Sequence, residues 1–112
     1  MMKLAYPGQS KYFGCIGADE QGLSLKQIID SEGVVSLMCE NKAYPTGLCA
    51  AIVHNRERSL IANLGAALHF PSEHFLKHAQ ELEEAKIIYG TGFFLTSNKQ
   101  ALLKVAREAR QR

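Results

Sequence analysis

The stretch at residues 44–67 constrains the fold more than any other part of the chain. A turn signal, Pro-Thr-Gly at 45–47, precedes an apolar run at 48–53. A short apolar run between turn residues is typical of a strand buried on both faces. Polar residues at 54–57 then allow the chain to reverse. The stretch therefore predicts a β-hairpin whose first strand is buried on both faces.

The second arm of this hairpin alternates in character. Leu60, Ala62 and Leu64 fall on one face, and Asn63 falls on the other. Arg58 begins the arm at the turn end. The three aliphatic side chains could close a core or form the wall of a pocket for a flat ligand, and the pattern alone favours the core.

The segments before the hairpin predict a strand, a helix and a second strand. Residues 12–16 and 34–39 are short apolar runs, and the helix covers residues 19–31 with Asp19 as its cap. Its apolar stripe is Leu25, Ile28 and Ile29, and Gly33 follows as a C′ residue. Strand, helix, strand and hairpin together indicate a mixed α/β fold.

The segments after the hairpin predict a helix, a strand and a last helix. Residues 65–68 close the hairpin strand, Ser72 caps a helix, and residues 86–89 have strand character. Ser97 or Asn98 caps the last helix. Its buried stripe consists of small and aliphatic residues: Ala101, Leu102, Val105, Ala106 and Ala109.

No candidate domain boundary occurs, so residues 1–112 are interpreted as one partial domain. In a doubly wound fold the last helix would lead into another strand. We therefore expect a chain that lacks parts of its domain at both ends.

Composition excludes several classes of protein. A net charge of +2 is too small to indicate a nucleic-acid or membrane partner. No apolar stretch approaches the roughly 20 residues that span a bilayer. The segment before Pro7 is too short for the apolar core of a signal peptide. These features predict a cytoplasmic protein, with the nucleus as an alternative.

The cysteines and histidines give no catalytic or metal site. Cys15, Cys39 and Cys49 are widely spaced and are expected to be reduced, buried thiols. Cys49 and His54 lie five positions apart on one predicted strand, so their side chains take opposite faces.

His74 and His78 have a spacing that can hold zinc, but Lys77 lies beside them and no His-Glu-x-x-His motif occurs. Surface histidines and the absence of a metal site are the expectation.

Four blocks in a fixed order resemble one protein family. They are Phe-Gly-Cys-Ile-Gly-Ala-Asp at 13–19, Pro-Thr-Gly-Leu-Cys-Ala-Ala at 45–51, Arg-Ser-Leu-Ile-Ala-Asn-Leu at 58–64 and Gly-Phe-Phe-Leu-Thr at 92–96. They look like the lid-hairpin region of adenosine kinases, in the pfkB/ribokinase family of sugar and nucleoside kinases. The resemblance runs from Tyr12 to Ala109. It implies a partial ribokinase-like α/β fold, a fragment of a doubly wound sheet plus the lid hairpin at about 34–67.

The resemblance also implies roles for particular residues. The positions expected to surround a purine nucleoside are Cys49, Leu60, Ala62, Leu64 and Phe93, with the aromatic ring against the purine. Arg58 is expected to approach the transferred phosphate, where a guanidinium would offset negative charge. Asn63 lies on the opposite face and is not assigned to the ligand.

The implied reaction is phosphoryl transfer from ATP to the 5′-hydroxyl of adenosine, giving AMP in purine salvage. The family's catalytic aspartate lies in a Gly-Ala-Gly-Asp motif, which these 112 residues lack. The first motif's initial glycines and the Asn/Glu region linked to magnesium are also missing. The ATP and Mg²⁺ of the full-length family therefore have no site in this chain, no catalytic base is assigned, and the chain alone is expected to be inactive.

The expected partner is adenosine or a similar purine nucleoside, and adenosine kinases of this family are usually monomers. We expect the isolated chain to be marginally stable and to self-associate, because an interior piece of a sheet exposes faces that neighbouring elements would cover. Two alternatives stay open: a non-catalytic module that binds a nucleoside or a protein, and another pfkB-family kinase that acts on a sugar. The aliphatic wall disfavours a sugar.

Overall fold

The computed structural model describes residues 7–111. The chain forms two compact units, Met1–Ala67 and Leu68–Arg112. The N-terminal segment for which the sequence predicts no signal peptide lies outside the described residues. One partial domain over 1–112 stays a prediction.

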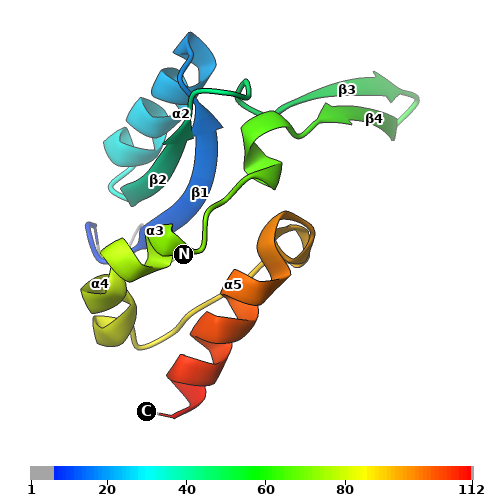
Figure 1. Ribbon diagram of the computed structural model, residues 1–112. Helices are drawn as coiled ribbons and strands as arrows, with labels where there is room; N and C mark the ends of the chain where they lie inside the picture. Colours follow the sequence, from blue (N-terminus) through cyan, green and yellow to red (C-terminus); the bar gives the residue numbers. More distant parts are fainter. Residues whose placement is uncertain (1–6, 112) are drawn as a thin grey trace. The chain divides into compact units, whose positions relative to one another are not determined.

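The first unit begins with a parallel pair of strands. Strand β1 (Lys11–Gly17) pairs with β2 (Val35–Asn41), and the register places Cys15 opposite Cys39. Helix α2 (Glu20–Ser31) connects them and packs against both strands (Figure 1). This arrangement confirms the predicted strand, helix and strand.

Helix α2 has the predicted ends but not the predicted burial. The Asp19 carboxylate accepts a hydrogen bond from Gly22 N at 2.8 Å, and Gly33 takes a left-handed conformation with φ of 76° just after the helix. The stripe was expected to be buried, yet Leu25 and Ile28 are exposed. The reason is that a sheet of two strands is too narrow to cover it.

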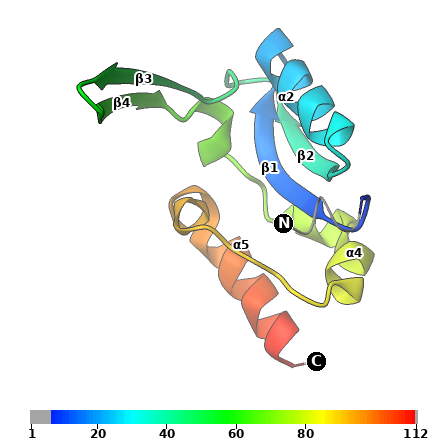
Figure 2. The ribbon, with the colours of Figure 1, turned by 180° about the vertical axis from the view of Figure 1, so that it is seen from behind.

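The hairpin is present as predicted. Strand β3 (Leu48–His54) pairs antiparallel with β4 (Glu57–Asn63). Asn55 and Arg56 form the turn with φ of 46° and 67°, the conformation that two-residue hairpin loops favour. The expected burial of β3 is wrong, because every residue of both strands is exposed. Within the described part of the chain the two strands pair only with each other, and the hairpin projects away from β1 and β2 (Figures 1 and 2).

The segment after the hairpin differs from the prediction in three places. Residues 65–68 form a 3-10 helix, η1 (Gly65–Leu68), rather than an end of the strand. Helices α3 (Glu73–Lys77) and α4 (Ala79–Glu84) follow, and the Ser72 side chain makes no capping bond to α3. The strand predicted at 86–89 is absent, and Ile87 and Tyr89 are 77% and 86% exposed. Apolar residues become a strand only where another strand pairs with them.

Helix α5 (Gly92–Arg110) is two helices joined at Asn98. Asn98 has non-helical angles, φ −154° and ψ 86°, and its Oδ1 accepts from Ala101 N at 2.9 Å. The predicted cap at Asn98 is therefore confirmed, although a further helical segment precedes it. Of the predicted stripe, Ala101 and Val105 are buried, Leu102 is partly buried, and the positions further along are exposed, because the described elements cover only one side of this helix.

Asn98 also ties α5 to the chain before α3. Its Nδ2 donates to the Phe70 carbonyl at 2.9 Å and to Ser72 Oγ at 3.0 Å. The Phe70 ring packs against Phe75 and Phe94, with centroids 4.8 Å and 5.0 Å away. These contacts form the core of the second unit together with Leu82, Ala101 and Val105. Within residues 7–111, no helix is long and apolar enough to cross a bilayer.

Asn98→Ala removes both the cap of the second helical segment and the two bonds to residues 70–72. We expect the free energy of unfolding of the second unit to fall by about 1–2 kcal/mol, measured by urea denaturation. Asn98→Asp keeps the acceptor for Ala101 but loses both donors, so a smaller loss is expected. Exposed Lys99→Ala is the matched control, and an equal loss in that variant would contradict the role of Asn98.

Candidate functional site

The register of the hairpin decides which side chains share a face. Cys49 pairs with Ala62, and Val53 pairs with Arg58. Paired residues of antiparallel strands point to the same side, and every second residue along a strand does so too. Cys49, Ala62, Leu60 and Arg58 therefore lie on one side of the hairpin, which we call the lid face.

The lid face is apolar over most of its length and cationic at one end. Ala51 pairs with Leu60, and Val53 lies opposite Arg58, so aliphatic side chains continue across both strands. Arg58 is exposed and stands next to the turn. Such a surface can hold a flat apolar ring against the strands and an anionic group near the turn.

The structure brings together four of the six residues that the sequence assigned to a site. Leu64 follows the end of β4 and is partly buried at the base of the hairpin. Phe93 belongs to the second unit, in the first turn of α5, where it is 79% exposed. Sequence patterns missed Ala51 and Val53, which pairing with Leu60 and Arg58 puts on the lid face. The alternation of β3 was the signal that could have found them.

The three cysteines do not share one environment. Cys15 and Cys39 are buried as predicted, but Cys49 is exposed because no described element of this unit packs over the hairpin. Burial raises the pKa of the Cys39 thiol to about 12, and a hydrogen bond with Cys15 acts in the same direction. His54 and Cys49 lie on β3 at positions of opposite parity, and the His54 ring contacts Asn55. The side chains of Cys49 and His54 therefore take opposite faces of the strand, as predicted.

The described residues do not fit a magnesium site. Residues 7–111 contain no group of three or more His, Cys, Asp or Glu side chains that could hold a metal ion. The two aspartates of the chain accept internal hydrogen bonds, Asp19 from Thr46 and Gly22, and Asp30 from Ser36. The rings of His74 and His78 pack edge to face at 4.8 Å, and His78 Nδ1 lies 3.5 Å from Glu81.

The base of the hairpin is held by a carboxylate that sequence reasoning treated only as a helix cap. Asp19 Oδ2 accepts from Thr46 N at 2.7 Å, and Oδ1 accepts from Thr46 Oγ1 at 2.5 Å. Thr46 Oγ1 in turn accepts from Gly17 N at 2.9 Å. Asp19 and Thr46 are 27 residues apart, so no local pattern could have paired them.

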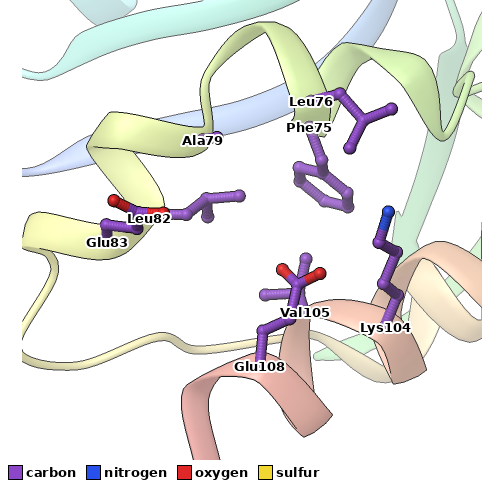
Figure 3. A pocket seen from close by; sticks show the side chains of 8 residues that line it. All are labelled: Phe75, Leu76, Ala79, Leu82, Glu83, Lys104, Val105 and Glu108. Carbon is purple, nitrogen blue, oxygen red and sulfur yellow. The ribbon is translucent and has the colours of Figure 1, made fainter. Parts of the chain in front are cut away.

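The second unit has a cavity of its own, of about 150 Å³. Phe75, Leu82 and Val105 point into it, and Lys104 and Glu108 stand at its border (Figure 3). None of the six predicted site residues lines it. The cavity lies where α3, α4 and α5 do not fill the space between them, and its walls are largely apolar.

Comparison with known proteins decides the family. The chain matches the pfkB family of carbohydrate kinases over residues 2–112. It belongs to this family. The fold is a part of the ribokinase-like α/β fold, as the four sequence blocks predicted. Membership of this family implies the use of ATP and a metal ion.

Relatives and solved structures show which members of the pfkB family this chain is similar to. It is 35% identical to adenosine kinase of Dictyostelium discoideum over 88% of this chain and 29% of the relative. A structure of apo adenosine kinase from Trypanosoma brucei brucei is 36% identical, with a TM-score of 0.87 over 98% of this chain and 34% of that one.

Adenosine kinase from Schistosoma mansoni, in complex with adenosine in an occluded loop conformation, is 29% identical, with a TM-score of 0.84 over 90% of this chain and 30% of that one. The pfkB-family chain thus spans about a third of the length of these proteins.

Thiol reactivity reports the difference between the cysteines of the pfkB-family chain. The thiolate is the nucleophile, and exposed Cys49 is accessible while buried Cys39 stays protonated near neutral pH. Intact-mass measurement should show one maleimide added at least about tenfold faster than the others. Cys49→Ser removes the fast addition. Fast labelling of Cys39 would contradict the burial of the β1–β2 pair.

Stability should decrease in acid because of Asp19 and Asp30. Hydrogen bonds from Thr46 and Gly22 lower the pKa of Asp19, and bonds from Ser36 lower the pKa of Asp30. A lowered folded-state pKa stabilises the fold above the unfolded-state pKa, near 3.9, and this stabilisation is lost as pH falls through the folded-state value. Urea denaturation below about pH 4 tests this. Asp19→Asn should flatten the acid dependence, and an unchanged curve would contradict it.

Proposed function

We propose that the chain is the nucleoside-lid part of an adenosine kinase, which transfers the γ-phosphoryl group of ATP to the 5′-hydroxyl of adenosine and gives AMP. The observation that carries the proposal is the lid face, where Cys49, Leu60 and Ala62 form an apolar wall with Arg58 at one end. Similarity to adenosine kinases, including one from Schistosoma mansoni in complex with adenosine, supports the same assignment.

The chemistry of the lid face suits a purine. A purine is flat and polarisable, so aliphatic and aromatic surfaces contribute much of its binding. Ala62 has a small side chain, which lets a ring approach the strand between Leu60 and Leu64. By similarity to adenosine kinases, we propose that Leu64 and Phe93 contact the nucleoside as well. Asn63 takes no part, because its side chain accepts a hydrogen bond from Gly65 N at the base of the hairpin.

The position of Arg58 suits the transferred phosphoryl group. Four residues along a strand separate Ala62 from Arg58, a span of about 13 Å. A purine against Ala62 therefore leaves room for the ribose and the phosphoryl group before Arg58. The guanidinium offers forked donors that match phosphoryl oxygens and offsets charge that develops on them during transfer.

Two requirements of the reaction, a base and a site for ATP with its metal ion, must be met by parts of the kinase outside these residues. Removal of the 5′-hydroxyl proton needs a base, and both aspartates of this chain are engaged in internal hydrogen bonds. ATP and its metal ion need a phosphate cradle and carboxylates. We therefore propose that the 112-residue chain alone does not phosphorylate adenosine and that its exposed apolar strands cause it to self-associate.

The test is an assay of the native polypeptide that carries these residues, isolated with an antibody against this chain and sized by mass spectrometry. With Mg²⁺ and ATP we expect phosphorylation of adenosine and not of ribose, by a product larger than the 12.4 kDa of this chain. Preferential phosphorylation of ribose would replace the proposal with a sugar kinase. A 12.4 kDa product that binds adenosine without turnover would replace it with a non-catalytic nucleoside-binding module.

Variants on the hairpin separate binding from catalysis. Arg58→Ala should lower kcat by about 10²- to 10³-fold with little change in KM for adenosine, because the contact acts on the transition state. Arg56→Gly is the matched control, since this turn arginine has a φ that glycine adopts easily. Equal losses in the two variants would contradict the role of Arg58. Adenosine should also slow alkylation of Cys49, and ribose should not.

A further inference from the structure

We propose that Asp19, acting through Thr46, is a positioning residue that fixes the base of the β3–β4 hairpin on β1 and α2. Its effect on catalysis rests on the proposed nucleoside kinase function. The anchoring itself rests only on contacts within the first unit.

The first support is the number of donors that converge on one carboxylate. Asp19 accepts from Gly22 N, Thr46 N and Thr46 Oγ1 at 2.5–2.8 Å. A helix cap needs only the first of these bonds. The other two come from Thr46, which is 7% exposed and also accepts from Gly17 N. One residue of the hairpin base is thus bound to the end of β1 and to the start of α2.

The second support is the set of glycines around this contact. A β-carbon at Gly17 would lie 2.5 Å from Thr46 N, and one at Gly22 would lie 2.7 Å from Thr46 Oγ1. Distances this short are not tolerated between such atoms. Both positions therefore need glycine for Thr46 to approach as closely as it does.

The third support is that the two arms of the hairpin are joined to each other next to Thr46. Ala66 N donates to the Pro45 carbonyl at 2.7 Å, which joins the second arm to the residue before Thr46. A β-carbon at Gly47 would lie 2.6 Å from the Leu64 carbonyl oxygen, so the two arms also touch. Because the arms are tied together, a displacement of Thr46 displaces the whole lid face.

Thr46 is close along the chain to the residues of the lid face, so its position affects a ligand that binds there. Cys49 is three residues beyond Thr46, and Ala62 pairs with Cys49. Beyond these contacts at its base the lid face is uncovered, since every residue of β3 and β4 is exposed. Loss of the Asp19–Thr46 contact loosens this base, so that the wall and Arg58 shift, and positioning errors of this kind reduce both binding and rate.

The test uses substitutions that separate anchoring from helix capping. Asparagine caps helices as well as aspartate does. In Asp19→Asn the amide oxygen can keep the bond to Gly22 N, but the amide NH₂ then faces Thr46 N–H, and two donors cannot bond. Thr46→Val keeps the shape of the side chain and removes its hydroxyl, whereas Thr46→Ser retains the hydroxyl and serves as the rescue variant.

The matched control is Asp30→Asn. Asp30 Oδ1 accepts from Ser36 N at 3.0 Å and from Ser36 Oγ at 2.7 Å, the same pair of donors that Thr46 gives to Asp19. This contact joins the far end of α2 to β2 and does not involve the hairpin. Asp30→Asn therefore reports the cost of disturbing such a contact without moving the lid face.

The measurements are amide hydrogen exchange and steady-state kinetics on the native polypeptide. In Asp19→Asn we expect exchange of the Thr46 amide to accelerate about tenfold while the Gly22 amide stays protected. In Asp19→Asn, KM for adenosine should rise about tenfold and kcat should fall. Thr46→Val should have the same effect on both constants, whereas Thr46→Ser and Asp30→Asn should have values near those of the wild type.

Each other outcome counts against the proposal. An unchanged Thr46 amide means that Asp19 does not hold the hairpin, and acceleration at Thr46 and Gly22 together means that it only caps α2. Altered exchange with unaltered kinetics removes the positioning role. If the wild-type polypeptide does not phosphorylate adenosine, the proposed function fails, and the exchange data still decide whether the anchor exists.

Discussion

The carboxylate of Asp19 is the contact on which the geometry of the first unit depends. It caps α2 through Gly22 N and holds Thr46 at the base of the hairpin, and Thr46 in turn binds Gly17 at the end of β1. Such convergence is possible because glycines at 17 and 22 allow backbone to approach backbone. An ionised carboxylate with three donors is a strong acceptor, and the same donors explain its lowered pKa. The hairpin therefore has a defined root although its strands are covered on neither face.

Features set by neighbours in sequence could be predicted, and features set by distant partners could not. Asp19 and Asn98 as caps, Gly33 after α2 and the turn at Asn55 follow from short-range chemistry, and the structure has all of them. The predictions that β3 is buried and that residues 86–89 form a strand were wrong. An apolar run shows only that its side chains can pack against another element, and it does not show that such an element is present. The described part of the chain provides no such partner for either segment.

The candidate site follows the same rule. Alternation alone places Arg58, Leu60 and Ala62 on one side, since it depends only on the geometry of a strand. Cys49 was assigned by resemblance, and the register with Ala62 supplies the physical reason why it joins them. The bond between Asp19 and Thr46 spans 27 residues and has no sequence signature of its own. The glycines at 17, 22 and 47 were the available hint in the sequence, but the structure is needed to show which atoms approach them.

The tie between Pro45 and Ala66 makes the hairpin a loop with a single closed neck. The segment enters and leaves the fold at one spot, so its exposed strands, β3 and β4, make no contact that the strands and helix beneath depend on. The side chains of the lid face and the direction in which the hairpin leaves the fold are thus set by different residues: the first by β3 and β4, the second by the Asp19 junction.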